Sequence, residues 1–380
     1  MIGSDLFAVA GTLLAAQYVT TGLYLRRLGK PAPKIGILGQ PRVSLLRPVC
    51  GRDDFDNETL ASSFLQDYPN YEIIFCAPSE KDPSVALVRQ LIAEHPNVAA
   101  RLLIGLDQVT GNPKLNNLWK GWNAATSDWI SMSDSNLMLP GDYLSQLVAA
   151  WGPETGLVSC PAIGTRPDNF GGSLECAFLN SNQARIQFTA DSIGHGFAQG
   201  KTLFWNRAML DAAGGIKALG RHLAEDATAT KIVYAQAKRV DLPQLPFSQP
   251  IGTRKLRQVW DRHLRWSRVR RDGFPWLFAG EFLNGPAIAT VFFALAMVML
   301  GRSPVFILAY LGLWYAPEVW LIHRARWPSG WKDFAALPVR DLLLPVMWAA
   351  TYLRRDIEWR GNAMSVPAPT SPSATIRMQQ

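Results

Sequence analysis

An apolar run close to the amino terminus constrains this chain more than any other feature. Residues 6–25 are about as long as a membrane-spanning helix, which needs roughly 20 apolar residues. Asp5 precedes this run, and Arg26 and Arg27 follow it directly. A cleaved secretory signal has its positive charge before the apolar stretch and a small-residue cleavage site after it, which is not the order found here. We therefore expect residues 1–30 to form an uncleaved membrane anchor, and the positive-inside rule places the following residues in the cytoplasm.

Three further apolar segments lie near the carboxyl end of the chain, at 284–300, 304–322 and 337–353. The gap between the first two is short enough to predict a tight hairpin, and the basic residues after the second are typical of a cytoplasmic loop. Proline and charged residues interrupt the start of the third segment, so it either crosses the membrane or forms a re-entrant or surface helix. Residues 276–355 are thus predicted to be a membrane region of two or three helices. The composition of residues 360–380, which include Pro, Ser and Thr, predicts a flexible tail.

The middle of the chain, residues 35–250, alternates strand-like and helix-like segments. Short apolar runs predict buried strands, and helical patterns occur at 58–66 and 83–95. Such alternation is typical of an α/β domain with a mostly parallel sheet and helices on its faces. Ligands of such sheets bind at the carboxyl ends of strands, and Asp134 directly follows one of them. The expected strands are 43–48, 71–76, 100–104 and 128–133.

Residues 251–275 differ in character from the rest of the chain. Between Arg254 and Arg271, eight Lys and Arg residues accompany a single acid, and apolar residues recur at helical spacing. This pattern predicts a basic amphipathic helix in the lipid headgroup layer. The net charge of +8 would also suit a nucleic acid or a phosphorylated substrate. Because membrane segments follow this helix directly, we expect its partner to be the lipid bilayer and not a nucleic acid. Its apolar positions are Leu256, Val259, Trp260 and Leu264.

Three aspartates and one cationic motif stand in the order that a nucleotide-sugar transferase needs. Such an enzyme positions a nucleoside, holds a diphosphate through a divalent metal and deprotonates an acceptor hydroxyl, which are tasks for carboxylates. The departing diphosphate also needs cations. Any one aspartate alone would more often cap a helix or form a turn, but all three followed by R-x-x-R-W make a far more specific pattern. The residues are Asp82 in SEKDP (79–83), Asp134 in SMSDSN (131–136), Asp226 in LAED (223–226) and the string RHLRW (262–266).

This pattern of D, D, D and (Q/R)-x-x-R-W resembles that of the ceramide glucosyltransferase family and its bacterial relatives. The resemblance extends from about residue 43 to residue 266, and it includes the strings VSLLRP (43–48), NPKLNNL (112–118), LEC (174–176) and AED (224–226). It implies a GT-A fold and an inverting transfer of a hexose from a UDP-sugar, with Mg²⁺ or Mn²⁺ as the metal. It also implies a lipid acceptor. The expected pair is UDP-glucose and ceramide, with diacylglycerol or another lipid as the alternative acceptor, at the cytoplasmic face of a bacterial inner membrane.

The resemblance also implies roles for individual residues of this chain. Asp226 would be the general base that takes the proton of the acceptor. Asp134 would hold the metal and the diphosphate, and Asp82 would contact the uridine. Lys114 matches a position near the nucleotide, although a solvated loop lysine is the alternative. The cationic group that would embrace the diphosphate is Arg262, Arg265 and Trp266.

The sequence departs from the family in the segment that follows the LEC string. Animal ceramide enzymes carry a His-Pro pair before an arginine, whereas Arg185 here follows the string NQA (182–184). The string QGK (199–201) also replaces a more apolar string at the expected acceptor wall. We expect both differences to affect the identity of the acceptor lipid and not the donor chemistry.

Two other classes of protein share parts of this pattern. A processive polysaccharide synthase would use the same aspartates and R-x-x-R-W motif, but it normally needs more membrane crossings to build a polymer channel. A transporter or a non-catalytic membrane scaffold would not need the catalytic spacing in a large middle domain. The apolar segments are also expected to lack the buried charges that mark a transport path.

Overall fold

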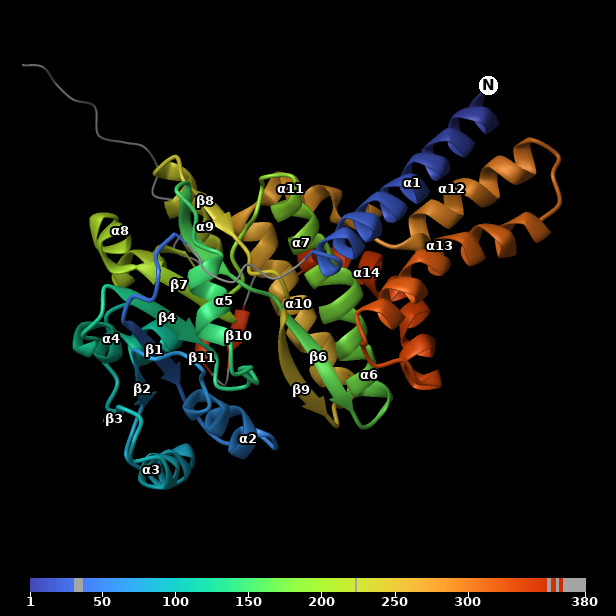
Figure 1. The fold of residues 1–380 in the computed structure, drawn as a ribbon. Helices are drawn as coiled ribbons and strands as arrows, with labels where there is room; N and C mark the ends of the chain where they lie inside the picture. The colour runs from blue at the N-terminus through green and yellow to red at the C-terminus, as the bar shows by residue number, and fades with distance from the viewer. Residues whose placement is uncertain (31–36, 223, 354–356, 360–361, 365–380) are drawn as a thin grey trace, which may run out of the picture.

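A computed structural model describes residues 1–30, 37–222, 224–353, 357–359 and 362–364 of the chain. Figure 1 shows two parts, a sheet flanked by helices and a group of long helices that extends to one side. The amino terminus lies at the far end of the helical group, beside helices from the carboxyl end of the chain. The two ends of the sequence therefore build one helical unit next to the α/β part.

The larger sheet has seven strands in the order β3-β2-β1-β4-β7-β5-β8. β1 pairs in parallel with β2 and β4, and β2 pairs in parallel with β3, so the four expected strands form the predicted parallel half. β7 runs antiparallel to both β4 and β5, which the sequence patterns did not predict. The strands are β1 (Val43–Pro48), β2 (Tyr71–Ala77), β3 (Ala100–Ile104), β4 (Trp129–Ser133), β5 (Thr155–Ser159), β7 (Thr202–Asn206) and β8 (Arg239–Asp241).

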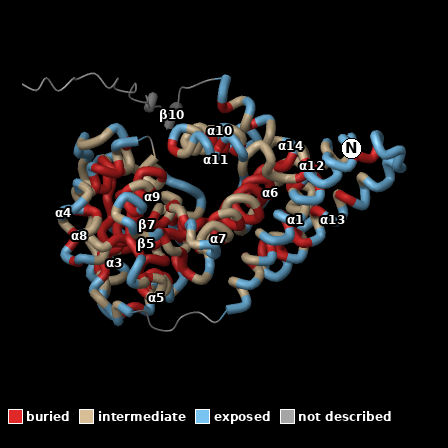
Figure 2. Tube along the Cα trace, turned by 90° about the horizontal axis from the view of Figure 1, so that it is seen from above, coloured by how far each residue is buried: buried red, intermediate tan, exposed pale blue. Residues whose placement is uncertain are grey.

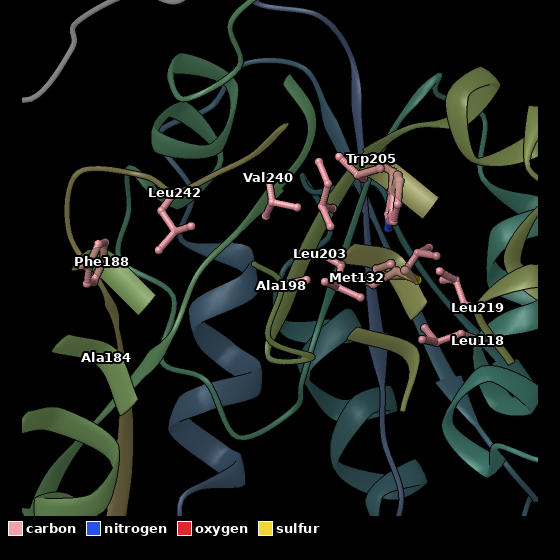
Figure 3. Packing of buried hydrophobic residues seen from close by; sticks show 14 of the residues in the cluster. Leu118, Met132, Ala184, Phe188, Ala198, Leu203, Trp205, Leu219, Val240 and Leu242 are labelled. Atoms are coloured by element: carbon pink, nitrogen blue, oxygen red, sulfur yellow. The ribbon is translucent and has the colours of Figure 1, made fainter. Parts of the chain in front are cut away.

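Both faces of this sheet are covered, which explains why its central strands are continuous apolar runs. Leu45 and Leu46 of β1 lie in two separate hydrophobic clusters, one on each face. Figure 3 shows one of these clusters, in which Met132, Leu203 and Trp205 from neighbouring strands gather near one another. The helices of this part are α2 (Asp56–Ala61), α3 (Ser84–Glu94), α4 (Pro113–Ala124), α5 (Tyr143–Ala149), α8 (Arg207–Ala212) and α9 (Glu225–Ala235).

A second, smaller unit lies between the large sheet and the long helices (Figure 1). Its two strands pair in parallel, and a π-helix, Phe178–Ala184 (η2), continues directly from α6 into α7. α6 packs against α14, so this unit joins the α/β part to the helical group. Its elements are β6 (Ala162–Pro167), α6 (Phe170–Ala177), α7 (Arg185–Ser192), β9 (Phe247–Gly252) and α10 (Leu256–Gly273).

Three of the long helices are long and apolar enough to cross a membrane, namely α1 (Ile2–Leu28), α13 (Val305–Arg324) and α14 (Trp331–Leu353). A fourth candidate among the described residues is the pair Pro275–Leu283 and Pro286–Met299, which is bent by 53° as in a broken span or a re-entrant loop. The third carboxy-terminal segment is thus longer than the sequence suggested. The first, α12 (Pro286–Met299), is the short one, with 14 residues. Figure 2 shows much exposed surface along α1, α12 and α13, as expected for helices that face lipid.

The basic helix α10 is packed more closely than a helix lying on a membrane surface. Of its predicted apolar face, Val259 is buried but Leu256 is 56% exposed. The buried stripe instead consists of Val259, His263 and Ser267, which recur every four residues and face the neighbouring helices α6, α9 and α14. Contact of α10 with lipid headgroups therefore stays a prediction. The predicted tail at 360–380 lies outside the described residues, apart from 362–364, which pair with 357–359.

The carboxy-terminal helices contain a buried ion cluster, so the expectation that they lack buried charges is wrong. Arg340 of α14 lies 2.6 Å from Glu318 of α13 and 2.7 Å from Asp341, and none of the three is more than 2% exposed. Its guanidinium also donates to the Ser181 hydroxyl in the π-helix, at 2.5 Å. The opposite charges compensate one another, and together they tie α13 and α14 to the unit that carries α6.

We predict that Arg340→Ala strongly destabilises the fold, because it leaves Glu318 and Asp341 buried without their cation. Loss of one partner from a buried ion pair typically costs about 3–5 kcal/mol. Thermal unfolding in detergent should show a clearly lower midpoint for this variant. Arg324→Ala is the matched control, since Arg324 is exposed at the end of α13. Equal midpoints for the two variants would contradict this account of the cluster.

Candidate active site

One of the predicted aspartates, Asp134, and the neighbouring Glu225 meet two lysines where β4 ends and α4 and α9 begin. Asp134 follows β4, and the antiparallel pairing of β4 with β7 brings Lys201 beside it. Lys114 Nζ lies 2.6 Å from Asp134 Oδ1 and 2.9 Å from Glu225 Oε1. It also donates to the Gly200 carbonyl oxygen at 2.5 Å, so all three of its N–H donors have an acceptor. Lys114 is therefore not a solvated loop lysine.

The local sequence explains why Lys114 points into this cluster. Asn112 caps α4, and its side-chain oxygen accepts from the backbone N–H of Lys114 at 2.9 Å. Pro113 occupies the first helical position, where its missing N–H has no cost. The Asn112 amide also donates to Glu225 Oε2 at 2.9 Å. The cap therefore fixes both the lysine and one of the carboxylates that it binds.

Electrostatics keeps Asp134 ionised. Burial alone would raise its pKa, but the charges of Lys114 and Lys201 outweigh burial and hold the pKa at about 2. The Lys201 ammonium lies 3.2 Å from Asp134 Oδ2. With its side chain 25% exposed, Asp134 is the most open member of this charged cluster. Asp134 is therefore the carboxylate of this cluster that is most accessible to a ligand.

Asp226 has a different environment at the start of α9. Its Oδ2 accepts from the backbone N–H of Gly200 at 3.0 Å, and its Oδ1 accepts from that of Ala227 at 2.7 Å. Burial, followed by the charge of Glu225, raises the pKa of Asp226 to about 6. A carboxylate with a pKa near neutrality is ionised at physiological pH and can still accept a proton, as a general base must.

Asp82 lies after β2, at the same edge of the sheet as Asp134. Its carboxylate accepts from the backbone N–H of Gly51 at 2.9 Å, and from the backbone N–H and hydroxyl of Ser84 at 2.9 and 2.6 Å. Burial alone would raise the pKa of Asp82, but these hydrogen bonds lower it. Asp82 thus ties the loop after β1 to the start of α3, which is a structural role beside any contact with a nucleoside.

The R-x-x-R-W motif lies on α10, which packs against α9, the helix that begins with Glu225 and Asp226. Burial lowers the pKa of Lys201, and the charge of Arg262 acts in the same direction. Trp266 packs against Cys176, Leu179 and Ile251. Arg265 is partly buried on the same helix.

Sequence reasoning missed Gly200, Lys201 and Glu225 as parts of this site. The QGK string was expected to affect only the acceptor lipid, but Lys201 contacts Asp134 and the Gly200 backbone contacts Asp226. Lys201 and Gly200 thus belong to the site, and the effect of this string on donor or acceptor stays a prediction. Only Glu225 gave a signal in the sequence, as the acid next to Asp226. The position of Lys201 depends on the β4–β7 pairing, which no local pattern encodes.

The site suits a divalent metal only together with donor phosphates. No group of three or more His, Cys, Asp or Glu residues that could hold a metal converges in the described part of the chain. Mg²⁺, however, is commonly bound by one or two carboxylates plus substrate phosphates. Asp134 is ionised and partly open, so it fits the role of such a carboxylate.

Comparison with known proteins identifies the family. The sequence profile of glycosyl transferase family 21 matches residues 7–371. The chain belongs to this family. It is similar to ceramide glucosyltransferase 1 of Caenorhabditis elegans, with 26% identity over 330 residues that cover 85% of this chain and 71% of the relative. It is also similar to a ceramide glucosyltransferase of Komagataella phaffii, with 28% identity over 288 residues that cover 60% of this chain and 56% of the relative.

The fold is likewise that of known glycosyltransferases. A mannosyltransferase from Pyrobaculum calidifontis, solved in complex with GDP-Man and Mn²⁺, superposes with a TM-score of 0.51 at 19% identity, covering 92% of this chain and 98% of that one. The predicted GT-A fold, with one amino-terminal and two or three carboxy-terminal apolar helices, is confirmed. The predicted resemblance to ceramide glucosyltransferases is also confirmed. The protein is a glycosyltransferase of family 21 with the helices of a membrane protein.

We predict that a side chain at Gly200 impairs this glycosyltransferase. A Cβ there would lie 2.7 Å from Glu225 Oε1, so the carboxylate oxygen that binds Lys114 would have to shift. Because small displacements at a reacting site can cost up to about 100-fold in rate, Gly200→Ala should lose on the order of 10- to 100-fold in transfer activity. Gly152→Ala is the control, since its nearest neighbour would be Thr155 Oγ1 at 3.5 Å. Full activity in Gly200→Ala would show that this contact is not needed.

Proposed function

We propose that this protein transfers a hexose from a UDP-sugar, with UDP-glucose the expected donor, to the hydroxyl of a membrane lipid, with ceramide the expected acceptor. The transfer inverts the anomeric configuration. The observation that carries this proposal is that Asp226, whose pKa is raised to about 6, accepts from the Gly200 N–H, next to Lys201, which together with Lys114 binds Asp134. The relatives named ceramide glucosyltransferase support the choice of acceptor.

The donor would bind with its diphosphate among the cations of the site. Lys114 and Lys201 would exchange part of their contact with Asp134 for phosphate oxygens, and Arg262 and Arg265 would approach from α10. A bound Mg²⁺ or Mn²⁺ on Asp134 would neutralise charge that develops on the diphosphate. Asp82 would orient the uridine, and Trp266 would close over the donor.

Asp226 would act on the acceptor. Its carboxylate takes the proton from the lipid hydroxyl while that oxygen attacks the anomeric carbon. The bond between the sugar and the diphosphate breaks in the same step, and UDP leaves with the electron pair. Attack from the face opposite UDP inverts the anomeric centre. The proton remains on Asp226 until water removes it.

The helical group would hold the catalytic site at the bilayer. We propose residues 1–30 as the anchor, 35–250 as the cytoplasmic catalytic domain, 251–275 as an interfacial helix and 276–355 as the membrane region. Trp276 and Leu277 support this arrangement, because they follow α10 and are 90% and 76% exposed, as expected for side chains that insert at an interface. The positive charges after the anchor favour a cytoplasmic site, at a bacterial inner membrane.

The direct test is transfer by the purified, detergent-solubilised enzyme. A panel of UDP-glucose, UDP-galactose and UDP-glucuronic acid is offered with ceramide or diacylglycerol, and products are read by mass spectrometry. We expect a ceramide carrying a single hexose from UDP-glucose. A glycosylated diacylglycerol would correct the acceptor, and polymeric products would favour a processive synthase. No transfer from any pair would overturn the proposal.

A pH profile should reveal Asp226 as the base. Since its pKa is about 6, transfer should be constant above that pH and fall about tenfold per unit below it, as the carboxylate becomes protonated. Asp226→Asn should lose on the order of 10²- to 10⁴-fold in turnover but bind UDP normally.

Glu225→Gln provides a control on the direction of this effect. The negative charge of Glu225 helps to raise the pKa of Asp226, so its removal should move the acid limb to lower pH. If the acid limb does not move in Glu225→Gln, or if it is still present in Asp226→Asn, then a group other than Asp226 causes it.

Metal dependence should centre on Asp134. We expect a chelator to abolish transfer, and Asp134→Ala to weaken UDP binding when metal is present, because one metal ligand is lost. Asp128→Ala is the matched control, since Asp128 is exposed near the opposite end of β4. Equal affinity for UDP with and without metal, measured by calorimetry, would contradict the role of Asp134.

A further inference from the structure

A buried carboxylate on α6 binds two consecutive residues of the R-x-x-R-W segment. Glu175 is 1% exposed, and its Oε1 accepts from Arg262 Nη1 at 2.8 Å. Its Oε2 lies 3.2 Å from His263 Nε2. Burial alone would raise the pKa of Glu175, but its contacts with His263 and Arg262 outweigh burial and hold the pKa at about 2. Glu175 is therefore a permanent anion inside the protein.

His263 completes this contact as a neutral ring. Burial lowers its pKa, so the imidazole carries a single proton at neutral pH. That proton must lie on Nε2, because Glu175 can only accept. Nδ1 is then free to accept from Gln183 Nε2, which lies at 3.3 Å. The ring also stacks on Phe178 with a centroid distance of 4.1 Å, so both its nitrogens and its plane are fixed.

Glu175 stands on an element that is itself held at both ends. The Asn169 side chain accepts from the Gly172 N–H at the start of α6 at 2.8 Å. At its other end, Arg340 of α14 donates to the Ala177 carbonyl oxygen at 3.3 Å. A carboxylate on such a support can define where a partner side chain points.

Arg262 is that partner. Its side chain is 27% exposed, and its helix, α10, packs against α9, which begins with Glu225 and Asp226 of the site. A guanidinium is planar and has five N–H donors in a fixed fork. The hydrogen bond from Nη1 to Glu175 restricts where the guanidinium lies and occupies only one of its five donors.

We propose that Glu175 is a positioning residue that orients Arg262 toward the departing diphosphate. This inference rests on the proposed function, since it requires a donor that releases a diphosphate. Glu175 does not touch the substrates. Because Glu175 already holds the Arg262 side chain, less conformational entropy is lost when the guanidinium binds the leaving group as negative charge develops on it. A purely structural role, in which Glu175 only joins α6 to α10, makes a different prediction.

The test separates kcat from KM. In the full-length enzyme, Glu175→Gln should lower kcat on the order of 10- to 100-fold, while KM for the donor and the affinity for UDP change by less than about threefold. Glu72→Gln is the matched control, because Glu72 is also buried and bound to an arginine, at 3.0 Å from Arg101, but lies on β2 away from the motif. Its folded fraction should retain the wild-type kcat.

A double-mutant cycle shows whether Glu175 acts through Arg262. Glu175→Gln combined with Arg262→Gln should be no slower than Arg262→Gln alone, because the oriented group is already missing. If Glu175→Gln fails to fold, Glu175→Asp replaces it. That variant keeps the negative charge, but its side chain is one methylene shorter and its carboxylate lies farther from Arg262, so its kcat should fall as well.

The outcomes distinguish this proposal from the function on which it rests. A wild-type kcat in folded Glu175→Gln or Glu175→Asp would overturn the positioning role and leave the transferase function standing. Fully additive losses in the double variant would also overturn it. A wild-type enzyme that transfers no sugar would overturn the proposed function, and this inference with it.

Discussion

The site depends on mutual compensation among buried charges. Lys114 lies between Asp134 and Glu225, and Lys201 binds the other oxygen of Asp134. None of these ions would be stable alone in so enclosed a position, because desolvation of a single charge costs several kcal/mol. The four groups lie directly after β4, on α4, on α9 and directly before β7, so their pairing also fixes how these elements meet. A donor diphosphate and its metal could exchange with these partners and leave the overall charge balanced.

A second set of ionic contacts connects the membrane helices to this site. Arg340 of α14 binds Ser181 and Ala177 in the α6 segment, and Glu175 of α6 binds Arg262 of α10. The helix that carries Arg262 in turn packs against α9, which begins with Glu225 and Asp226. The helical group, which both ends of the chain build, thus supports α10 and its R-x-x-R-W motif beside the catalytic domain. This arrangement fits an enzyme whose acceptor stays in the bilayer while its donor is soluble.

Local patterns predicted much of this fold but little of the site's connectivity. The four apolar runs from residue 43 to residue 133 are the parallel strands β1 to β4, because strands covered on both faces must be apolar throughout. The sequence did not predict the contact between Lys201 and Asp134, because it depends on the antiparallel pairing of β7 with β4, two strands that are far apart in the chain. Glu175 looked like part of a family string, and nothing in its neighbours indicates that it binds Arg262. The buried Arg340 cluster was missed because its charges are separated along two helices.

The stereochemistry of the product tests the central claim most directly. If Asp226 is a base in a single displacement, transfer from UDP-α-glucose must give a β-linked glycolipid. The anomeric configuration can be read by proton NMR of the purified lipid product, from the coupling of the anomeric proton. A β-linkage would support one inverting step at the site built by Asp226, Asp134 and the two lysines. An α-linkage would contradict it, because retention requires a different chemical course.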